Sequence, residues 1–204
     1  MRLEYLIERR LIRHCCVWIQ LINLLGNKDM ARMAYADLDA LDEETKAILA
    51  TRRSPGGNIF RMIANAGKVT GSYLNYGTEL RKHLAIDILI YEFAIVRVAN
   101  LSKSGYVARQ HEQFLRRNDV DEDKILALRM RPSLKYFSEA ELAAINFAEE
   151  VVLDVKVSDK TFAEAQKYYN EEQLMHLMLS TAHYMLASRI AETFEVDLQP
   201  ARKD

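Results

Sequence analysis

The residues LAIDILIYEFAIVRVANL, at positions 84–101, place apolar side chains around nearly the whole circumference of a helix. A helix of this kind is buried on all sides, whereas a surface helix carries one apolar stripe. The rest of the chain must therefore supply the elements that surround it. Elsewhere apolar residues recur at helical spacing, and only three prolines and seven glycines interrupt them. We expect an all-α fold in which residues 84–101 are buried.

Turn and capping signals divide the flanking sequence into further helices. We expect helices near 42–48 and over 58–66, 69–83, 103–117, 122–128 and 138–153. Ser138 followed by Glu141 has the spacing of a capping box, and Asn170 followed by Gln173 repeats it at the start of the last long helix. Ser158 is expected to cap a short helix between these two.

Length and charge restrict the kinds of partner. The chain has 204 residues, half of them hydrophobic, which is enough for the core of one domain. Its 28 basic and 29 acidic residues give a formal charge of −1, so nucleic acid is not an expected partner. A membrane-spanning helix takes about 20 apolar residues, and no such run is present. We expect no membrane partner.

The first thirty residues differ from the rest. We expect a helical extension over 1–30, a single helical domain over 31–200 and a charged tail over 201–204. Arg9, Arg10 and Arg13 precede an apolar run over 15–25, which is the order found in a signal peptide, although Glu4 and Glu8 interrupt the basic N-terminal stretch. The alternative interpretation is an amphipathic helix that covers a partner.

The cysteines and paired histidines do not indicate a metal site. Cys15 and Cys16 are adjacent, and neighbouring residues do not meet the geometry of an unstrained disulfide. They indicate free thiols in a reducing compartment, so we expect a cytoplasmic protein. His176 and His183 are two helical turns apart, roughly 10 Å along the axis, which is too far to share one ion easily.

Glu92 is a carboxylate within the apolar stretch. An ionised carboxylate without a partner would be costly to bury there, so Glu92 must be protonated, paired or facing a cavity. One interpretation pairs it with Arg81 or Arg97 in an interior salt bridge. The functional interpretation makes it a proton carrier with a raised pKa.

His111 belongs to the next expected helix. Ser104, Val107 and His111 lie at i, i+3 and i+7, so they form one stripe with apolar neighbours. His111 is therefore expected to face the core. A histidine in this position is either a hydrogen-bonded packing residue or an acid or base that works near neutral pH.

Together these residues resemble the signature of the carboxymuconolactone decarboxylase and alkylhydroperoxidase-D-like family. The similar residues are 91–99, which contain Glu92, then 104–106 and His111. In that family a glutamate on one helix precedes a short loop and a second helix whose motif ends in histidine. Segments 58–62, 137–149 and 184–189 resemble the flanking helices. The resemblance implies an alkylhydroperoxidase-D-like helical bundle that assembles as a homo-oligomer, namely a dimer, trimer or hexamer.

The chain departs from the redox branch of this family at two positions. That branch carries two cysteines, three residues apart, where this chain has Ser104 and Val107. Reduction of peroxide by a dithiol needs an activated thiolate and a resolving thiol, and serine with valine supplies neither. What remains resembles the decarboxylase branch, whose members act on small carboxylated lactones without a metal or organic cofactor. We therefore expect no cofactor.

The resemblance also implies roles for individual residues. His111 is the candidate general acid or base, and Glu92 orients it or restores its proton. The candidate tyrosines would donate a hydrogen bond to an enolate oxygen, and the candidate arginines would hold a substrate carboxylate. The expected substrate contacts are those of Ser104, Tyr106, Arg97, Tyr184 and Arg189.

Three functions compete at this point. The first is a cofactor-independent lyase or isomerase that moves a proton on a small carboxylated lactone or keto acid. The second is a peroxide or redox function that relies on external thiols or on Cys15 and Cys16. The third is a non-catalytic helical oligomer in which Glu92 and His111 form a buried polar pair. Absence of a cavity beside that pair would support the third.

Overall fold

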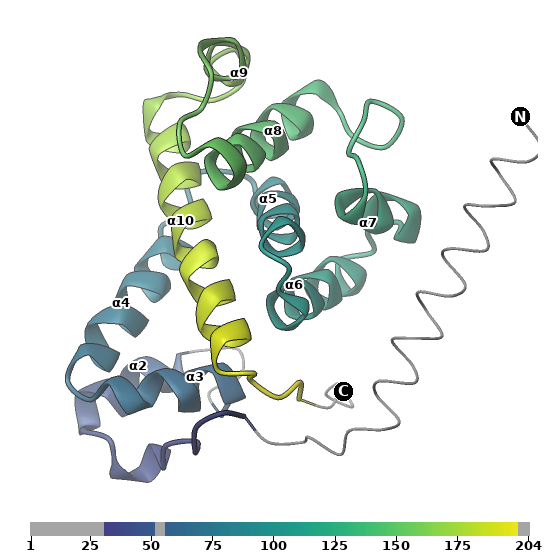
Figure 1. Ribbon diagram of the computed structural model, residues 1–204. Helices are drawn as coiled ribbons and strands as arrows, with labels where there is room; N and C mark the ends of the chain where they lie inside the picture. Colours follow the sequence, from purple (N-terminus) through teal and green to yellow (C-terminus); the bar gives the residue numbers. More distant parts are fainter. Residues whose placement is uncertain (1–30, 52–55, 200–204) are drawn as a thin grey trace, which may run out of the picture. The chain divides into compact units, whose positions relative to one another are not determined.

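The computed structural model describes residues 31–51 and 56–199, and all regular structure in these ranges is helical. The expected all-α fold is therefore confirmed (Figure 1). The extension predicted over 1–30, with its two cysteines, and the tail predicted over 201–204 lie outside the described residues.

The helices follow the expected order. They are α2 (Glu43–Ala50), α3 (Asn58–Ile63), α4 (Val69–Lys82), α5 (Ile88–Leu101), α6 (Gly105–Arg117), α7 (Glu122–Arg129), α8 (Glu139–Asp154), α9 (Asp159–Ala165) and α10 (Glu171–Thr193). Two short 3-10 helices, η1 (Leu38–Ala40) and η2 (Ala64–Ala66), complete the set in the described ranges. The helix expected from residue 84 begins at Ile88, because the Asp87 carboxylate accepts the backbone N–H groups of Leu89 and Ile90 and so caps it.

Helix α5 is the centre of the fold. Every residue from Tyr91 to Ala99 is buried, as the apolar circumference predicts. Helices α6, α7, α8 and α10 pack around it, and Figure 1 shows α5 enclosed by these four. One face of α5 packs Phe93 and Val96 against residues of α7 and α8. The opposite face packs Tyr91 and Ile95 against α8 and α10, so the polar side chains of α5 have fixed positions.

A short turn sets the position of α6 relative to α5. Ser102 ends α5, and Lys103 adopts a left-handed conformation with φ of 56°. The Ser104 hydroxyl then accepts the backbone N–H of Val107 and caps α6. This turn returns the chain along α5 and brings the side of α6 that carries His111 beside Glu92.

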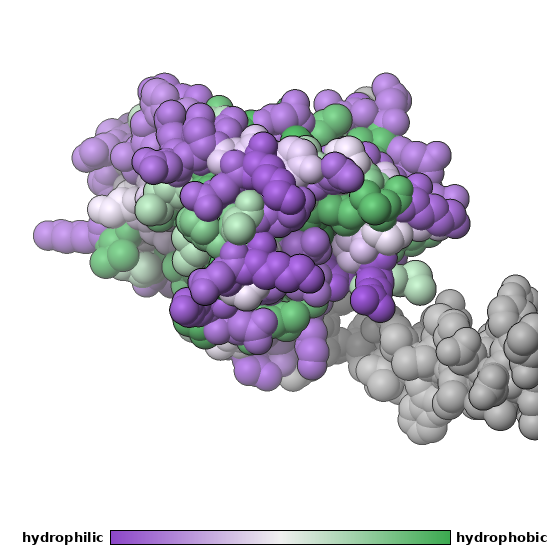
Figure 2. All heavy atoms as spheres, turned by 90° about the horizontal axis from the view of Figure 1, so that it is seen from above, coloured by the Kyte–Doolittle hydropathy of each residue, from purple (hydrophilic) through white to green (hydrophobic). Residues whose placement is uncertain are grey.

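The surface is mixed in character. Figure 2 views the molecule from the end at which α9 lies, and hydrophilic residues cover most of that face, with hydrophobic residues in small groups between them. Among the described helices, none combines the length and apolar character that crossing a bilayer requires.

Val155 ends α8 in an unfavourable conformation, and its replacement gives a prediction about stability. Its φ of 66° is left-handed, which is strained for a β-branched residue, and 86% of its surface is exposed. We expect Val155→Gly to raise the free energy of unfolding by about 0.5–1 kcal/mol, because relief of strain exceeds the entropy cost of glycine. Urea unfolding measures the change. Val152→Gly, inside the same helix, should be destabilising; a destabilised Val155→Gly protein would contradict the argument.

Candidate active site

The buried Glu92 carboxylate joins three helices. Its side chain, on α5, has no exposed surface. One carboxylate oxygen, Oε1, lies 2.9 Å from Nη1 of Arg81 on α4. The other, Oε2, lies 2.5 Å from Nδ1 of His111 on α6. Both oxygens therefore have a charged or polar partner, which is the condition for burying a carboxylate at an acceptable cost.

The neighbours of Glu92 keep it ionised. Burial by itself would raise the pKa of the Glu92 carboxyl, but the charge and hydrogen bond of His111, followed by those of Arg81, outweigh burial. The net result is a pKa below the ordinary value of 4.5. The expectation of a raised pKa was wrong, because it considered burial of Glu92 without two simultaneous partners. The salt bridge expected with Arg81 is present.

The ionised carboxylate selects the tautomer of His111. A carboxylate can only accept hydrogen bonds, so Nδ1 of His111 must carry the proton that lies between the two groups. In the neutral imidazole this leaves Nε2 as the nitrogen that can accept a proton. The ring of Tyr184 contacts the imidazole edge-on, with ring centroids 4.6 Å apart. Glu92 and Tyr184 together hold the imidazole in one orientation.

A cavity of about 710 Å³ lies beside this pair. Its walls include residues of α3, α4, α5, α6 and α10, among them Arg81, Glu92, His111, Tyr106 and Tyr184. This volume is in the range of cavities that hold small organic ligands. Absence of a cavity would have favoured a non-catalytic polar pair, but a cavity is present.

Tyr106 and Tyr184, two of the expected substrate contacts, lie on the cavity wall. The hydroxyl oxygen of Tyr106 accepts the backbone N–H of Ile59 at 3.3 Å, so its own proton can be donated to a ligand. Tyr184 is hydrogen-bonded to Tyr91, whose pKa burial raises well above its ordinary value. Burial also raises the pKa of the Tyr106 hydroxyl, so Tyr106 is protonated at neutral pH and can act as a hydrogen-bond donor.

Arg97 does not reach the cavity, contrary to the prediction. Its Nε lies 2.7 Å from Oε2 of Glu149, and its Nη1 donates to the carbonyl oxygens of Leu128 and Met130 at 3.1 and 3.0 Å. Arg97 thus connects α5 to α8 and to the end of α7. It does not pair with Glu92, and it is not among the residues that line this cavity.

Two other predicted substrate contacts also lie outside the cavity walls. Ser104 is 1% exposed and has its hydroxyl engaged in capping α6. Arg189 lies on the exposed side of α10 and donates to the Met185 carbonyl of its own helix. Neither belongs to the lining of the cavity beside His111.

Two arginines that do line the cavity were missed as ligand contacts. Arg81 was considered only as a partner of Glu92, and Arg117 was not considered. A signal for Arg117 exists in the sequence, because Gln110, Gln113, Phe114 and Arg117 form one helical stripe next to His111. For Arg81 the sequence offers no comparable signal, since only the packing of α4 against the rest of the domain brings it there.

The histidines of α10 are packed among aromatic rings. His183 lines the cavity and stacks on Tyr73, with ring centroids 5.3 Å apart. His176 lies against Tyr91, and burial lowers its pKa. Within 31–51 and 56–199, no three His, Cys, Asp or Glu side chains gather in a way that could hold a metal ion.

The comparisons with known proteins identify the fold. No family model and no curated protein matches this sequence. Among solved structures, an uncharacterised peroxidase-related protein from Ralstonia eutropha, described as an alkylhydroperoxidase AhpD core, aligns with a TM-score of 0.72 at 18% identity over 83% of this chain and 93% of its own. A peroxidase-related protein from Silicibacter aligns with a TM-score of 0.70 at 14% identity, over 86% and 95% of the two chains.

A third solved structure with this fold is an enzyme of named activity. The debrominase Bmp8 aligns with a TM-score of 0.68 at 15% identity, over 85% of this chain and 93% of its own. At these identities the likeness establishes the fold. The chain has the alkylhydroperoxidase-D-like helical fold, as the motif around Glu92 and His111 indicated.

The lowered pKa of Glu92 predicts how stability depends on pH. Because the folded-state pKa lies below the ordinary value of 4.5, the ionised form stabilises the protein above that pH, and this contribution is lost as pH falls through the folded-state pKa. We expect Glu92→Gln to lower the free energy of unfolding at pH 7 by about 3 kcal/mol and to weaken its decline below pH 4.5.

Denaturant unfolding at a series of pH values measures both effects. Glu122→Gln is the matched control, because Glu122 forms an exposed ion pair with Arg116 at 2.8 Å and its loss should matter far less at pH 7. If the free energy of unfolding fell equally steeply below pH 4.5 in Glu92→Gln and in the unaltered protein, Glu92 would not be ionised in the folded state.

Proposed function

We propose that this protein is a cofactor-independent enzyme, a lyase or isomerase that moves a proton on a small carboxylated molecule such as a lactone or keto acid. The observation that carries the proposal is His111, held through Nδ1 by the ionised Glu92 on the wall of a cavity of about 710 Å³. An imidazole oriented in this way by a carboxylate is suited to general acid and base catalysis.

In the proposed reaction His111 handles the proton. When a carboxylated substrate loses carbon dioxide, the bond between carbon and carboxylate breaks and its electron pair enters an enolate. Protonated His111 then gives the proton on Nε2 to the carbon, and Glu92 stabilises the imidazolium before that transfer. In an isomerisation the same nitrogen removes a proton from one carbon and returns it to another.

The negative charge that develops on the enolate oxygen of the substrate must be stabilised by hydrogen-bond donors that are already in position. Tyr106 and Tyr184 lie in the cavity wall, and burial raises the pKa of Tyr106. We propose that one of them donates to the enolate oxygen, because a prearranged donor in a site with little water stabilises the transition state more than the ground state. Arg81 acts as a positioning residue that keeps Glu92 ionised.

The solved structures with this fold support a small-molecule substrate. A variant of the debrominase Bmp8 in which alanine replaces a cysteine binds 2,3,4-tribromopyrrole, a small planar ring. Two of the structural neighbours are described as peroxidase-related, which keeps a redox function as the second candidate. Both cysteines of this chain precede residue 31. Hydroperoxide consumption that depends on added thiol would favour the second candidate.

Replacement of His111 tests the proposed mechanism. A screen of small lactones and keto acids identifies a substrate, and His111→Gln should then reduce kcat by about 100-fold or more, since general acid and base catalysis typically contributes that much. Circular dichroism should show an unchanged fold. The control is His83→Gln, because His83 is exposed and lies outside the cavity walls. Full activity in His111→Gln would rule out the mechanism.

We also propose that the protein is a cytoplasmic homo-oligomer, either a dimer, a trimer or a hexamer. The apolar side chains of Met175, Leu179 and Leu186 are exposed on α10, and burial against a second copy would remove them from water. Light scattering should give a mass that is a multiple of the monomer. Leu186→Glu should lower that mass, and a monomeric unaltered protein would contradict this proposal.

A further inference from the structure

One end of the cavity carries a positive charge that the proposed proton transfer does not use. The charged residues among its described walls are Arg81, Glu92 and Arg117. Arg81 and Glu92 form an ion pair, so their charges compensate each other. Arg117 makes no ion pair with any residue in the described ranges, and its side chain is exposed. The cavity therefore has an excess of positive charge and is complementary to an anion.

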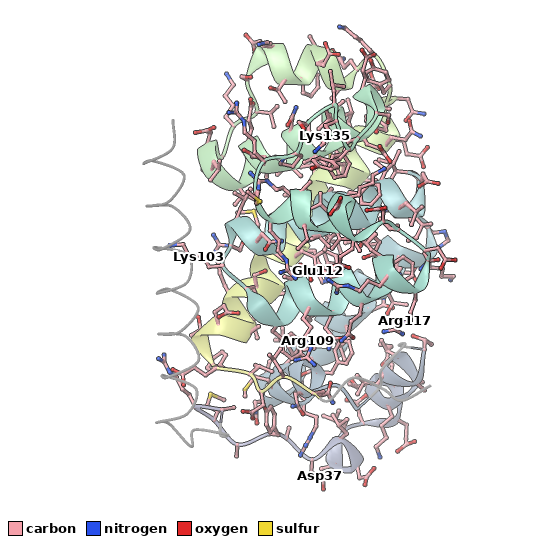
Figure 3. The ribbon with its side chains drawn as sticks, turned by 90° about the vertical axis from the view of Figure 1, so that its right-hand side faces the viewer. Asp37, Lys103, Arg109, Glu112, Arg117 and Lys135 are labelled. Atoms are coloured by element: carbon pink, nitrogen blue, oxygen red, sulfur yellow. The ribbon has the colours of Figure 1, made fainter. Side chains whose placement is uncertain are left out.

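Arg117 is positioned along the same helix as His111. Gln110, Gln113, Phe114 and Arg117 lie at i, i+3, i+4 and i+7 of α6, and all four line the cavity. Figure 3 shows Arg117 at the end of α6, on the side of this helix nearer to α2, α3 and α4. Arg117 comes six positions after His111, which is about 9 Å along the helix axis. A ligand that contacts both is therefore elongated.

The wall between these two residues is aromatic. Phe114 lies on α6 between His111 and Arg117, and the Arg81 guanidinium carbon lies 5.3 Å from the centre of its ring. Phe60 and Tyr73 add rings from α3 and α4. Flat apolar walls favour a planar ligand body, because an aromatic or conjugated group can stack on rings at little cost in conformational entropy. The amides of Gln110 and Gln113 can donate further hydrogen bonds to an anionic head group.

We propose that the cavity binds an aromatic or conjugated monocarboxylic acid lengthwise along α6. Its carboxylate pairs with Arg117, its planar body lies against Phe114, and its other end lies at His111. The part of the inference that concerns the reacting end rests on the isomerisation described in the proposed function, because a carboxylate held by Arg117 lies away from His111. Carboxylate recognition by Arg117 does not depend on that function. Guanidinium groups bind carboxylates through two parallel hydrogen bonds, which fixes the direction of the ligand.

Calorimetric titration with trans-cinnamate, cinnamamide and acetate tests this inference on the full chain. Cinnamate should bind, whereas cinnamamide, which lacks the charge, and acetate, which lacks the planar body, should bind at least tenfold more weakly. Arg117→Gln should weaken cinnamate binding about tenfold or more, since a charge-assisted pair is lost. Raised salt concentration should weaken cinnamate binding to the unaltered protein.

The matched control removes the same charge from the same helix. Arg109 lies on α6 but outside the cavity walls, so Arg109→Gln should bind cinnamate as the unaltered protein does. Arg117→Lys, which keeps the charge but loses the planar fork, should give an intermediate affinity. Cinnamate binding that is unchanged in Arg117→Gln, equal to that of cinnamamide, or absent from the unaltered protein would overturn the inference.

His111→Gln separates this inference from the proposed function. That variant should still bind cinnamate more tightly than cinnamamide, because the carboxylate pairs at the other end of the cavity. Cinnamate binding through Arg117, together with no turnover of any carboxylic acid, would refute the proposed function and leave the binding site intact. Turnover with an unchanged KM in Arg117→Gln would refute the inference and leave the function intact.

Discussion

The site depends on the contacts that the ionised Glu92 carboxylate, which has no exposed surface, forms with Arg81 and His111. Removing such a group from water is costly, and the cost is acceptable only while both partners are present. Because the three residues come from α5, α4 and α6, this requirement also fixes how these helices pack around the cavity. The polar site and the apolar core are therefore parts of one packing arrangement.

That interaction also explains how the proposed acid and base chemistry could proceed without a thiol in the described domain. Glu92 cannot donate a proton while its pKa is lowered, so it orients His111 and stabilises the charge that the imidazole acquires. His111 lies on the cavity wall and is the residue proposed to exchange a proton with the substrate. Arg81 pairs with Glu92, and in the proposed binding mode Arg117 is the described cavity residue that recognises the carboxylate.

Local patterns were sufficient to predict the helices and the central pair. The apolar circumference of residues 84–101 predicted the buried α5, and helical spacing with the family resemblance placed Glu92 and His111. Arg97 was misassigned because its partners, at Leu128, Met130 and Glu149, are more than 30 residues away in the chain. Long-range packing of this kind leaves no periodic signal. The sign of the Glu92 pKa shift likewise required both partners to be located in space.

The tautomer of His111 is the property that tests this account most directly. Nitrogen-15 NMR of the imidazole, assigned through His111→Gln, distinguishes a protonated Nδ1 from a protonated Nε2. The account predicts that the neutral imidazole carries its proton on Nδ1, shared with Glu92, and not on Nε2, and that Glu92→Gln removes this preference. A neutral His111 with its proton on Nε2 in the unaltered protein would contradict the account.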